Sequence, residues 1–167
     1  YGIPMTGLRF FTVYGPWGRP DMSPILFADA ITHGRPIKVF NHGHHRRDFT
    51  YIDDIVDGVL LCLDRAPEPD PQWSDIDSDA SRSNAPWRIY NIGRGEPVDL
   101  MRYIELLEQA LGKTTQRELL PAQPGDVAET FADIEPLVRD TGYAPKVSLE
   151  QGLERFAQWY KDYYRAE

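Results

Sequence analysis

An almost unbroken apolar run near the start of the chain constrains the fold more than any other feature. Residues 5–14 are rich in Phe, Leu, Val and Thr, and they lie between Pro4 and the breaker pair Gly15-Pro16. A run of this length between breakers predicts a strand. Strands that lack polar alternation are typical of parallel sheets with both faces covered. We therefore expect an α/β protein in which residues 5–14 form a buried strand.

Five helices are predicted from their start and stop signals. Ser23 as N-cap and Pro24 as the first helical residue are typical of a helix start and Gly34 of a helix end, so the first helix is expected over residues 24–33. The others are expected from Asp53 or Asp54 as N-cap to residue 63, from Asp99 as N-cap to Gly112, and from Asp133 as N-cap to about Thr141. The last helix is expected to begin at a capping box of Ser148 and Gln151.

Further extended segments are predicted at residues 37–40, 48–52, 88–92 and 118–120. Residues 66–86 differ in composition, because prolines there alternate with aspartates and serines and few apolar groups are available for burial. Such a segment is expected to be an acidic, Pro-rich surface loop.

Composition argues against several classes of function. The net charge of −8 is unfavourable for general binding to nucleic acid. No apolar run approaches the roughly 20 residues that cross a bilayer. The single Cys62 cannot form an internal disulfide, which is typical of a reducing compartment. We therefore expect a cytoplasmic protein with neither a nucleic-acid nor a membrane partner.

Five motifs in a fixed order carry a resemblance to one family. They are Leu8-Arg-Phe-Phe-Thr-Val-Tyr-Gly-Pro-Trp-Gly-Arg-Pro-Asp-Met22, Arg47-Asp-Phe-Thr-Tyr-Ile-Asp-Asp54, Tyr90-Asn-Ile-Gly93, Gln123-Pro-Gly-Asp126 and Thr130-Phe-Ala-Asp133. Together they resemble the C-terminal half of an extended short-chain dehydrogenase/reductase. Within that family the chain is most similar to the nucleotide-sugar 4-epimerases, and among these to the UDP-glucuronate 4-epimerases. The resemblance extends from Tyr1 to about Tyr164.

The resemblance implies that residues 1–167 are the C-terminal, substrate-binding portion of one such domain. The expected fold is the late strands of a Rossmann-type sheet with a small mixed substrate-binding domain. The family's Gly-rich dinucleotide loop and its Ser/Thr and Tyr-x-x-x-Lys catalytic set would belong to an absent N-terminal portion, since this sequence contains neither the loop nor the Tyr-Lys spacing. No catalytic residue is therefore expected here. NAD, the implied cofactor, would be bound mainly by the absent portion, and this chain alone is expected to be inactive and weakly stable.

Two arginines are the first candidates for contact with a nucleotide diphosphate, because Arg offers planar, permanently charged, bidentate donors. Arg47 stands between a predicted turn and a predicted strand, although from position alone it can equally pair with Asp48 or Asp54. Arg19 lies in a loop, where an arginine is usually solvated. The resemblance implies that Arg47 contacts the diphosphate and that Arg19 contacts either the diphosphate or a sugar carboxylate.

The resemblance also assigns places around the ligands to seven further residues. Thr12 would lie near the sugar, Tyr14 and Pro16 beside the nicotinamide, Phe40 against the uracil ring, Met22 in the nucleotide pocket, and Gln123 and Asp126 near the ribose or a phosphate. Without the resemblance, Thr12 and Phe40 can be explained by packing, and Asp126 by a turn stabilised by its own side chain.

Two polar clusters are better explained by local structure than by a metal site or an acid/base pair. His42, His44 and His45 form a turn without a carboxylate or cysteine at metal-ligand spacing, so a solvated turn and no metal are expected. Asp53 and Asp54 precede an apolar helix, which favours an N-cap and a helix-dipole partner over an acid/base pair.

The implied function is the UDP-sugar-binding half of a UDP-glucuronate 4-epimerase, which acts through NAD-mediated oxidation and reduction at sugar C4. Its substrate would be a UDP-sugar such as UDP-glucuronate, and the full-length protein can form a homodimer. Two alternatives stay open. One is a UDP-sugar decarboxylase or 4,6-dehydratase of the same family, and the other is a non-catalytic nucleotide-sugar-binding module.

Overall fold

In the computed structural model, which describes residues 2–76 and 79–166, the predicted first strand is divided into two. β1 (Met5–Phe10) pairs in parallel with β6 (Trp87–Ile92), and β2 (Thr12–Tyr14) pairs in parallel with β5 (Phe49–Tyr51). The partner changes at Phe11, whose N–H donates to the Ile92 carbonyl at 3.2 Å, whereas the Thr12 N–H donates to the Asp48 carbonyl at 3.1 Å. The prediction of one continuous strand over residues 5–14 is therefore wrong, because its two halves join different neighbours.

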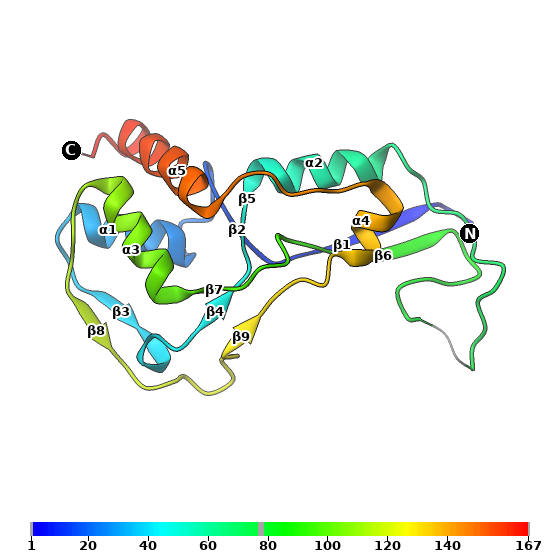
Figure 1. Ribbon diagram of the computed structural model, residues 1–167, viewed down its shortest axis with the longest axis horizontal. Helices are drawn as coiled ribbons and strands as arrows, with labels where there is room; N and C mark the ends of the chain where they lie inside the picture. Colours follow the sequence, from blue (N-terminus) through cyan, green and yellow to red (C-terminus); the bar gives the residue numbers. More distant parts are fainter. Residues whose placement is uncertain (1, 77–78, 167) are drawn as a thin grey trace.

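The expectation that this strand is buried on both faces is also wrong. α2 (Ile52–Leu63) and α4 (Glu135–Thr141) share a core with Tyr90 and Ile92 of β6, so both helices cover one face of the β1–β6 pair (Figure 1). On the other face of β1, Met5, Gly7 and Arg9 are exposed. No described element covers that face, so the side chains on it are exposed to solvent.

The remaining strands form two small sheets around the other end of the molecule. β3 (Ile37–Val39) pairs in parallel with β8 (Arg117–Leu119). β4 (Arg46–Arg47) lies between β7 (Val98–Asp99), to which it is antiparallel, and β9 (Glu129–Thr130), to which it is parallel. The expected α/β fold with parallel strands and a small mixed sheet is confirmed, and the mixed sheet places Arg47 at its centre.

Three helices enclose a second core at that end of the molecule (Figure 1). They are α1 (Ser23–Thr32), α3 (Leu100–Leu111) and α5 (Leu149–Tyr164). Their buried side chains pack with those of β3 and β5, so this core is separate from the one beneath α2. None of the described helices is long and apolar enough to cross a membrane.

The predicted helix ends are confirmed where a glycine or a capping box defines them. The Ser148 hydroxyl accepts the Gln151 N–H at 3.2 Å, and the Gln151 side chain accepts the Ser148 N–H at 3.3 Å, which completes the capping box of α5. Gly112 ends α3 in the left-handed conformation, as expected. Asp99 is the N-cap of α3 by position, although its side chain makes no capping bond.

Three other N-cap predictions are wrong. α1 begins at Ser23 and its N-cap is Met22, and α2 has Tyr51 as its N-cap. Asp53 and Asp54 lie inside the first turn of α2, where they complement the helix dipole. Asp133 precedes the N-cap of α4 by one residue, yet its carboxylate accepts the Glu135 N–H at 3.1 Å. Asp53 and Asp54 instead have partners that are distant in the sequence, namely Arg155 for Asp53 and the N–H groups of Lys146 and Val147 for Asp54.

The acidic, Pro-rich segment is mostly exposed in its described residues, 66–76 and 79–86. It has internal order, because Arg82 lies 3.5 Å from the Asp70 carboxylate and forms an isolated bridge with Arg88. Residues 77 and 78 of the predicted loop lie outside the described residues.

Candidate functional site

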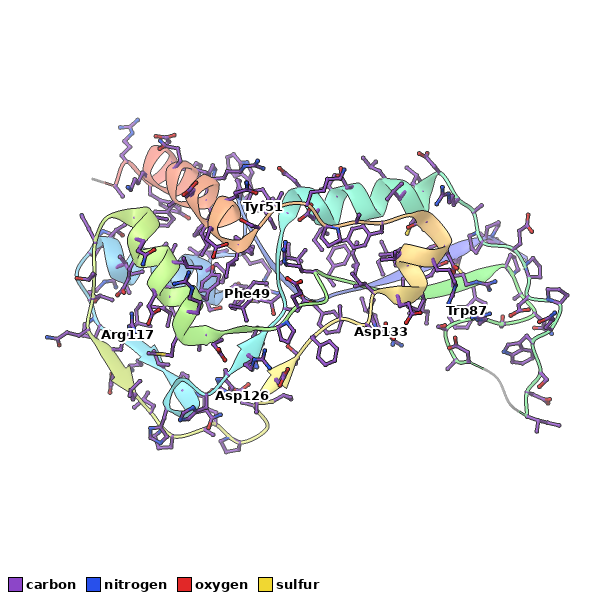
Figure 2. All side chains as sticks on the ribbon, in the orientation of Figure 1. Phe49, Tyr51, Trp87, Arg117, Asp126 and Asp133 are labelled. Atoms are coloured by element: carbon purple, nitrogen blue, oxygen red, sulfur yellow. The ribbon has the colours of Figure 1, made fainter. Side chains whose placement is uncertain are left out.

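A cavity of about 530 Å³ gathers five of the residues singled out from the sequence: Thr12, Met22, Phe40, Arg47 and Asp126. They come from five separate segments, namely the start of β2, the turn before α1, the turn after β3, strand β4 and the loop between β8 and β9. Asp126 lies on that loop next to β4 (Figure 2). The small sheets therefore bring together side chains that are distant in the sequence.

The Arg47 side chain is held by two carbonyl groups and one carboxylate. Nη1 donates to the carbonyl oxygens of Arg46 at 2.9 Å and Ala128 at 3.1 Å. Nη2 donates to Asp126 Oδ1 at 3.0 Å. The side chain is largely buried, at 20% exposure, so its position is fixed before any ligand arrives. A fixed, partly desolvated guanidinium is a strong site for an anion.

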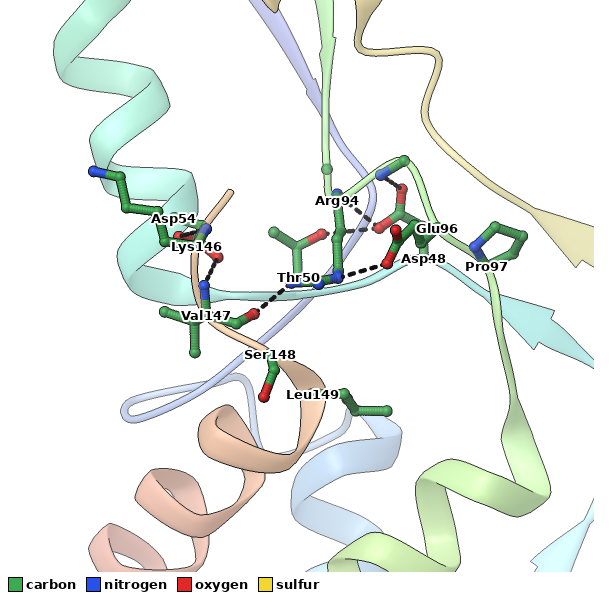
Figure 3. A network of polar contacts seen from close by, with 12 residues as sticks. Asp48, Thr50, Asp54, Arg94, Glu96, Pro97, Lys146, Val147, Ser148 and Leu149 are labelled. Carbon is green, nitrogen blue, oxygen red and sulfur yellow. Dashed lines mark hydrogen bonds and ion pairs between the residues drawn. The ribbon is translucent and has the colours of Figure 1, made fainter. Parts of the chain in front are cut away.

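The alternative pairings of Arg47 with Asp48 or Asp54 are wrong. Asp48 is fully buried and accepts the backbone N–H groups of Arg94 and Gly95, each at 2.8 Å (Figure 3). Asp54 accepts the N–H groups that precede α5. Both carboxylates are thus occupied by backbone N–H groups, and Asp126 is the carboxylate partner of Arg47.

His45 belongs to the site although sequence reasoning missed it, and the expectation of a solvated histidine turn is wrong for this residue. Its side chain is 5% exposed, lines the cavity, and places Nε2 at 3.1 Å from Asp126 Oδ2. His42 and His44 are exposed, as expected. In the part of the chain that is described, no group of three His, Cys, Asp or Glu side chains could hold a metal ion.

The backbone of the preceding turn explains why His45 points inward. Segment η1 (Phe40–Gly43) contains Asn41 and His42 with φ of 50° and Gly43 with φ of 85°. Three successive left-handed residues reverse the chain sharply between β3 and β4. The φ of 85° favours glycine at position 43, where a Cβ would also lie 2.7 Å from the Met101 sulfur. The residues Asn41 and Gly43 indicate a turn, but they do not predict which histidine is buried.

The cavity combines positive charge with an apolar lining. Lys38 and Arg47 provide cations, Asp126 provides one carboxylate, and Phe40 and Phe49 provide aromatic surface. This arrangement suits a ligand with an anionic group and a flat ring. Lys38 was also missed, although the alternation along β3 places it on the face opposite the two buried residues of that strand.

A second cavity, of about 400 Å³, is lined by Tyr14, Pro16, Arg19 and Met22. Met22 lines both cavities, so the two are neighbours. Arg19 and Arg47 therefore lie in different cavities. The Arg19 guanidinium is 75% exposed and contacts the Asp21 carboxylate at 2.5 Å, which lowers the pKa of Asp21.

The loop that carries Arg19 is anchored by Trp17. Its ring packs against Trp159 and Tyr163 of α5, with centroid separations of 5.7 Å and 5.0 Å. Such edge and tilted contacts are favourable arrangements for aromatic rings. The far end of α5 therefore holds the rim of the second cavity in place.

Tyr14 is a core residue as well as part of the wall of the second cavity. Its hydroxyl donates to the Leu149 carbonyl at 3.3 Å, and its ring contacts Phe49 and Tyr103 edge-on. Burial, together with the neighbouring Tyr51, raises the pKa of Tyr14 above that of a free tyrosine. Its expected place beside a nicotinamide, like that of Pro16, stays a prediction.

Gln123 is exposed and does not line either cavity in the described structure. Its carbonyl accepts the Asp126 N–H at 3.1 Å, so its backbone shapes the turn that presents Asp126. The Asp126 side chain binds Arg47 and His45, and the alternative that it stabilises its own turn is wrong. Contact of Gln123 with a ligand stays a prediction.

Comparison with known proteins identifies relatives of this chain. The family model described as "NAD dependent epimerase/dehydratase family" matches residues 1–93. A probable UDP-glucuronate 4-epimerase of Rhizobium meliloti is 45% identical over 166 residues, which cover 99% of this chain and 49% of that protein. UDP-glucuronate 4-epimerase 3 of Arabidopsis thaliana is 44% identical over 168 residues, which cover 98% of this chain and 38% of that protein.

A solved structure of a 4-epimerase is also similar to this chain in its fold. The crystal structure of UDP-glucuronic acid 4-epimerase from Bacillus cereus, in complex with UDP-glucuronic acid and NAD, matches with a TM-score of 0.78 and 33% identity. The match covers 97% of this chain and 46% of that one. The chain thus spans about half the length, or less, of the relatives it matches.

Proposed function

We propose that this chain, which belongs to the NAD-dependent epimerase/dehydratase family, is the nucleotide-sugar-binding half of a UDP-glucuronate 4-epimerase. The observation that carries the proposal is the cavity in which Arg47, Phe40 and Asp126 meet. A fixed guanidinium can bind a diphosphate, an aromatic ring can pack against a base, and a carboxylate can accept a ribose hydroxyl. The names of the relatives at 45% and 44% identity support the choice of this reaction within the family.

In this proposal each group in the first cavity binds one part of UDP. Arg47 binds the diphosphate, and Lys38 adds positive charge at the same cavity. Phe40 lies against the uracil ring, and Met22 forms part of the apolar wall. Asp126 accepts a hydrogen bond from a ribose hydroxyl, because a carboxylate beside the diphosphate would repel it.

The sugar would extend past Met22 toward the second cavity. Thr12 lines the first cavity and offers a hydroxyl near this passage. Arg19 lies on the second cavity, away from Arg47, which favours contact with a sugar carboxylate over contact with the diphosphate. Gln123 would reach the ligand only if its loop moved, since it is exposed and lines neither cavity.

The second cavity fits a flat ring such as nicotinamide, because Tyr14, Pro16 and Trp17 give it an apolar wall. When bound, NAD supplies oxidation at sugar C4 and reduction from the opposite face. This chain would orient the sugar and exclude water at that wall. The residues that move the proton would come from the remainder of a full-length protein, since the sequence contains no Tyr-x-x-x-Lys.

Exposed apolar surface supports a role as one half of a larger protein. Met5 and Phe10 of β1 are 61% and 55% exposed. On α2, Val56, Leu60 and Leu63 are exposed as well. Such surface is typical of a buried interface. The same proposal includes residues 1–167 as the C-terminal portion of a single domain, a cytoplasmic location and a homodimer of the full-length protein.

The product of the reaction separates the candidate functions. The full-length gene product should interconvert UDP-glucuronate and UDP-galacturonate. A UDP-pentose with carbon dioxide would indicate the decarboxylase, and a 4-keto-6-deoxy sugar would indicate the 4,6-dehydratase. UDP binding without any product would favour the non-catalytic binding module.

Binding variants test the site itself. Arg47→Ala should raise the Kd for UDP by about 10–100-fold, because a charge-assisted contact to the diphosphate is lost. Arg46→Ala is the matched control, since Arg46 pairs with Glu129 and Asp99 on the surface and does not line the cavity. It should change the Kd by less than about threefold. Equal losses in both variants would contradict the proposed role of Arg47.

A further inference from the structure

Both oxygens of the Asp126 carboxylate are held, each by a different side chain. Oδ1 accepts from Arg47 Nη2 at 3.0 Å, and Oδ2 lies 3.1 Å from His45 Nε2. His45 is 5% exposed, and Asp126 is 31% exposed at the cavity. The buried imidazole therefore fixes the second oxygen of a carboxylate whose first oxygen is bound by Arg47.

The contacts of Arg47 determine which of its hydrogens a ligand can reach. A guanidinium carries five N–H donors. Nη1 uses two on the carbonyls of Arg46 and Ala128, and Nη2 uses one on Asp126. Within residues 2–76 and 79–166, no acceptor is found for the Nε–H or for the second hydrogen of Nη2. Two N–H donors therefore remain for an anion.

A rotated Asp126 would occupy one of these two remaining donors as well as the one that it already holds. Arg and carboxylate side chains favour bidentate pairing, in which both oxygens bind one guanidinium. If Oδ2 left His45, it could reach a second N–H of Arg47. An incoming phosphate would then have to displace a carboxylate with two bonds instead of using unoccupied donors. The His45 bond to Oδ2 prevents this competition.

We propose that His45 is a positioning residue that holds Asp126 in a one-oxygen contact with Arg47, so that Arg47 keeps a two-hydrogen edge for a diphosphate. This inference rests on the proposed function of the cavity. The position of His45 is itself well defined, because its carbonyl accepts the Leu100 N–H at 2.8 Å. Gly43, in the turn before it, lies beside the Met101 side chain. The imidazole acts on the ligand only through Asp126 and Arg47.

Three substitutions at one position separate the hydrogen bond from the volume of the ring. His45→Met fills the space without a donor. His45→Asn places an amide near the position of Nδ1, too far from Asp126, and provides a second loss variant should His45→Met fail to fold. His45→Gln places its amide nitrogen near the position of Nε2 and can restore the bond. His44→Met, at the exposed neighbouring histidine, is the matched control.

The experiment measures the Kd for UDP and for uridine by calorimetry in the full-length gene product. His45→Met and His45→Asn should weaken UDP binding by about tenfold more than uridine binding, since one charge-assisted contact to phosphate is lost. His45→Gln should regain most of that difference. In an Asp126→Asn background, where the competing charge is absent, His45→Met should add no further difference between the two ligands.

The outcomes that overturn the inference differ from those that overturn the proposed function. Equal losses for UDP and uridine, no loss in either variant, or no recovery in His45→Gln would show that His45 does not act through Arg47. Failure of the unmodified protein to bind UDP would overturn the proposed function, and this inference with it. A merely structural role of His45 would alter the melting temperature of all three variants without separating the two ligands.

Discussion

The buried carboxylate of Asp48 accepts the backbone N–H of Arg94 at 2.8 Å, which fixes the loop after β6 against the start of β5 (Figure 3). The same carboxylate accepts the N–H groups of Gly95 at 2.8 Å and Ala132 at 3.0 Å, and the Thr50 hydroxyl at 3.0 Å. Asp48 thus joins three segments beside Arg47. The geometry of the candidate site depends on a neighbouring residue that does not line it.

Asp48→Ala should lower the free energy of unfolding by about 3 kcal/mol or more, because each backbone N–H left without an acceptor costs about 1–3 kcal/mol. Urea unfolding measures this loss. Asp57→Ala is the control, since the Asp57 side chain is half exposed and lies 3.8 Å from Lys146. It should change the stability by less than about 1 kcal/mol. A similar, small effect of both variants would contradict the role assigned to Asp48.

Local signals allowed much of the fold to be predicted from the sequence. The capping box of Ser148 and Gln151 and the glycine that ends α3 each act within one helical turn, so their neighbours in the sequence are also their partners in space. The prediction that Asp53 or Asp54 is an N-cap is wrong, because the partners of Asp54 are distant in the sequence. Asp54 accepts the N–H groups of Lys146 and Val147, which follow it by about ninety residues (Figure 3).

The candidate site could be predicted only in part, because its side chains also have partners that are distant in the sequence. Arg47 and Asp126 were singled out by motif, and the structure brings them within 3.0 Å. His45 was not, because its burial depends on the handedness of the turn before it and on a carboxylate from a distant loop. The separation of Arg19 from Arg47 also depends on packing, since Trp17 binds the Arg19 loop to α5.

Tyr103→Phe should raise the free energy of unfolding by about 1–2 kcal/mol. Tyr103 is fully buried and stacks on Phe49 at 4.0 Å, but its hydroxyl finds no hydrogen-bond partner among the described residues. Removal of an unpaired buried hydroxyl removes its desolvation cost. Tyr143→Phe is a matched control with the opposite expectation, because the buried Tyr143 hydroxyl donates to the Gly93 carbonyl at 2.9 Å. Thermal or urea unfolding that ranks the two variants in the other order would reject this account.

Stability should fall at alkaline pH in part through Tyr90. Burial, and then a hydrogen bond from its hydroxyl to Asp140 at 2.9 Å, raise the pKa of Tyr90 to about 12. Because an unfolded tyrosine has a pKa of about 10, the unfolded chain loses this proton first as the pH rises. The contribution of Tyr90 is therefore fully present below about pH 10 and is lost as the pH rises toward about 12.

Tyr90→Phe should flatten that alkaline decline, although the loss of the Asp140 bond lowers stability by about 1 kcal/mol at neutral pH. Urea unfolding from about pH 9 to about pH 12 measures the slope. Tyr163→Phe, at an exposed tyrosine, serves as the control and should keep the slope of the unmodified protein. An unchanged slope in Tyr90→Phe would show that Tyr90 does not contribute to the pH dependence.

Phe40→Ala should weaken the binding of UDP and of uridine by the same factor, about tenfold, because a ring that stacks on a base contributes about 1–3 kcal/mol whether or not phosphate is present. Phe40→Trp should retain most of the affinity, since its ring offers a similar face. Arg47→Ala should instead discriminate between the two ligands, because only UDP carries the diphosphate. The two variants thus test separately whether Phe40 binds the base and whether Arg47 binds the diphosphate. If Phe40→Ala left uridine binding unchanged, Phe40 would be a packing residue of the turn after β3, and the base would have to bind elsewhere in the cavity.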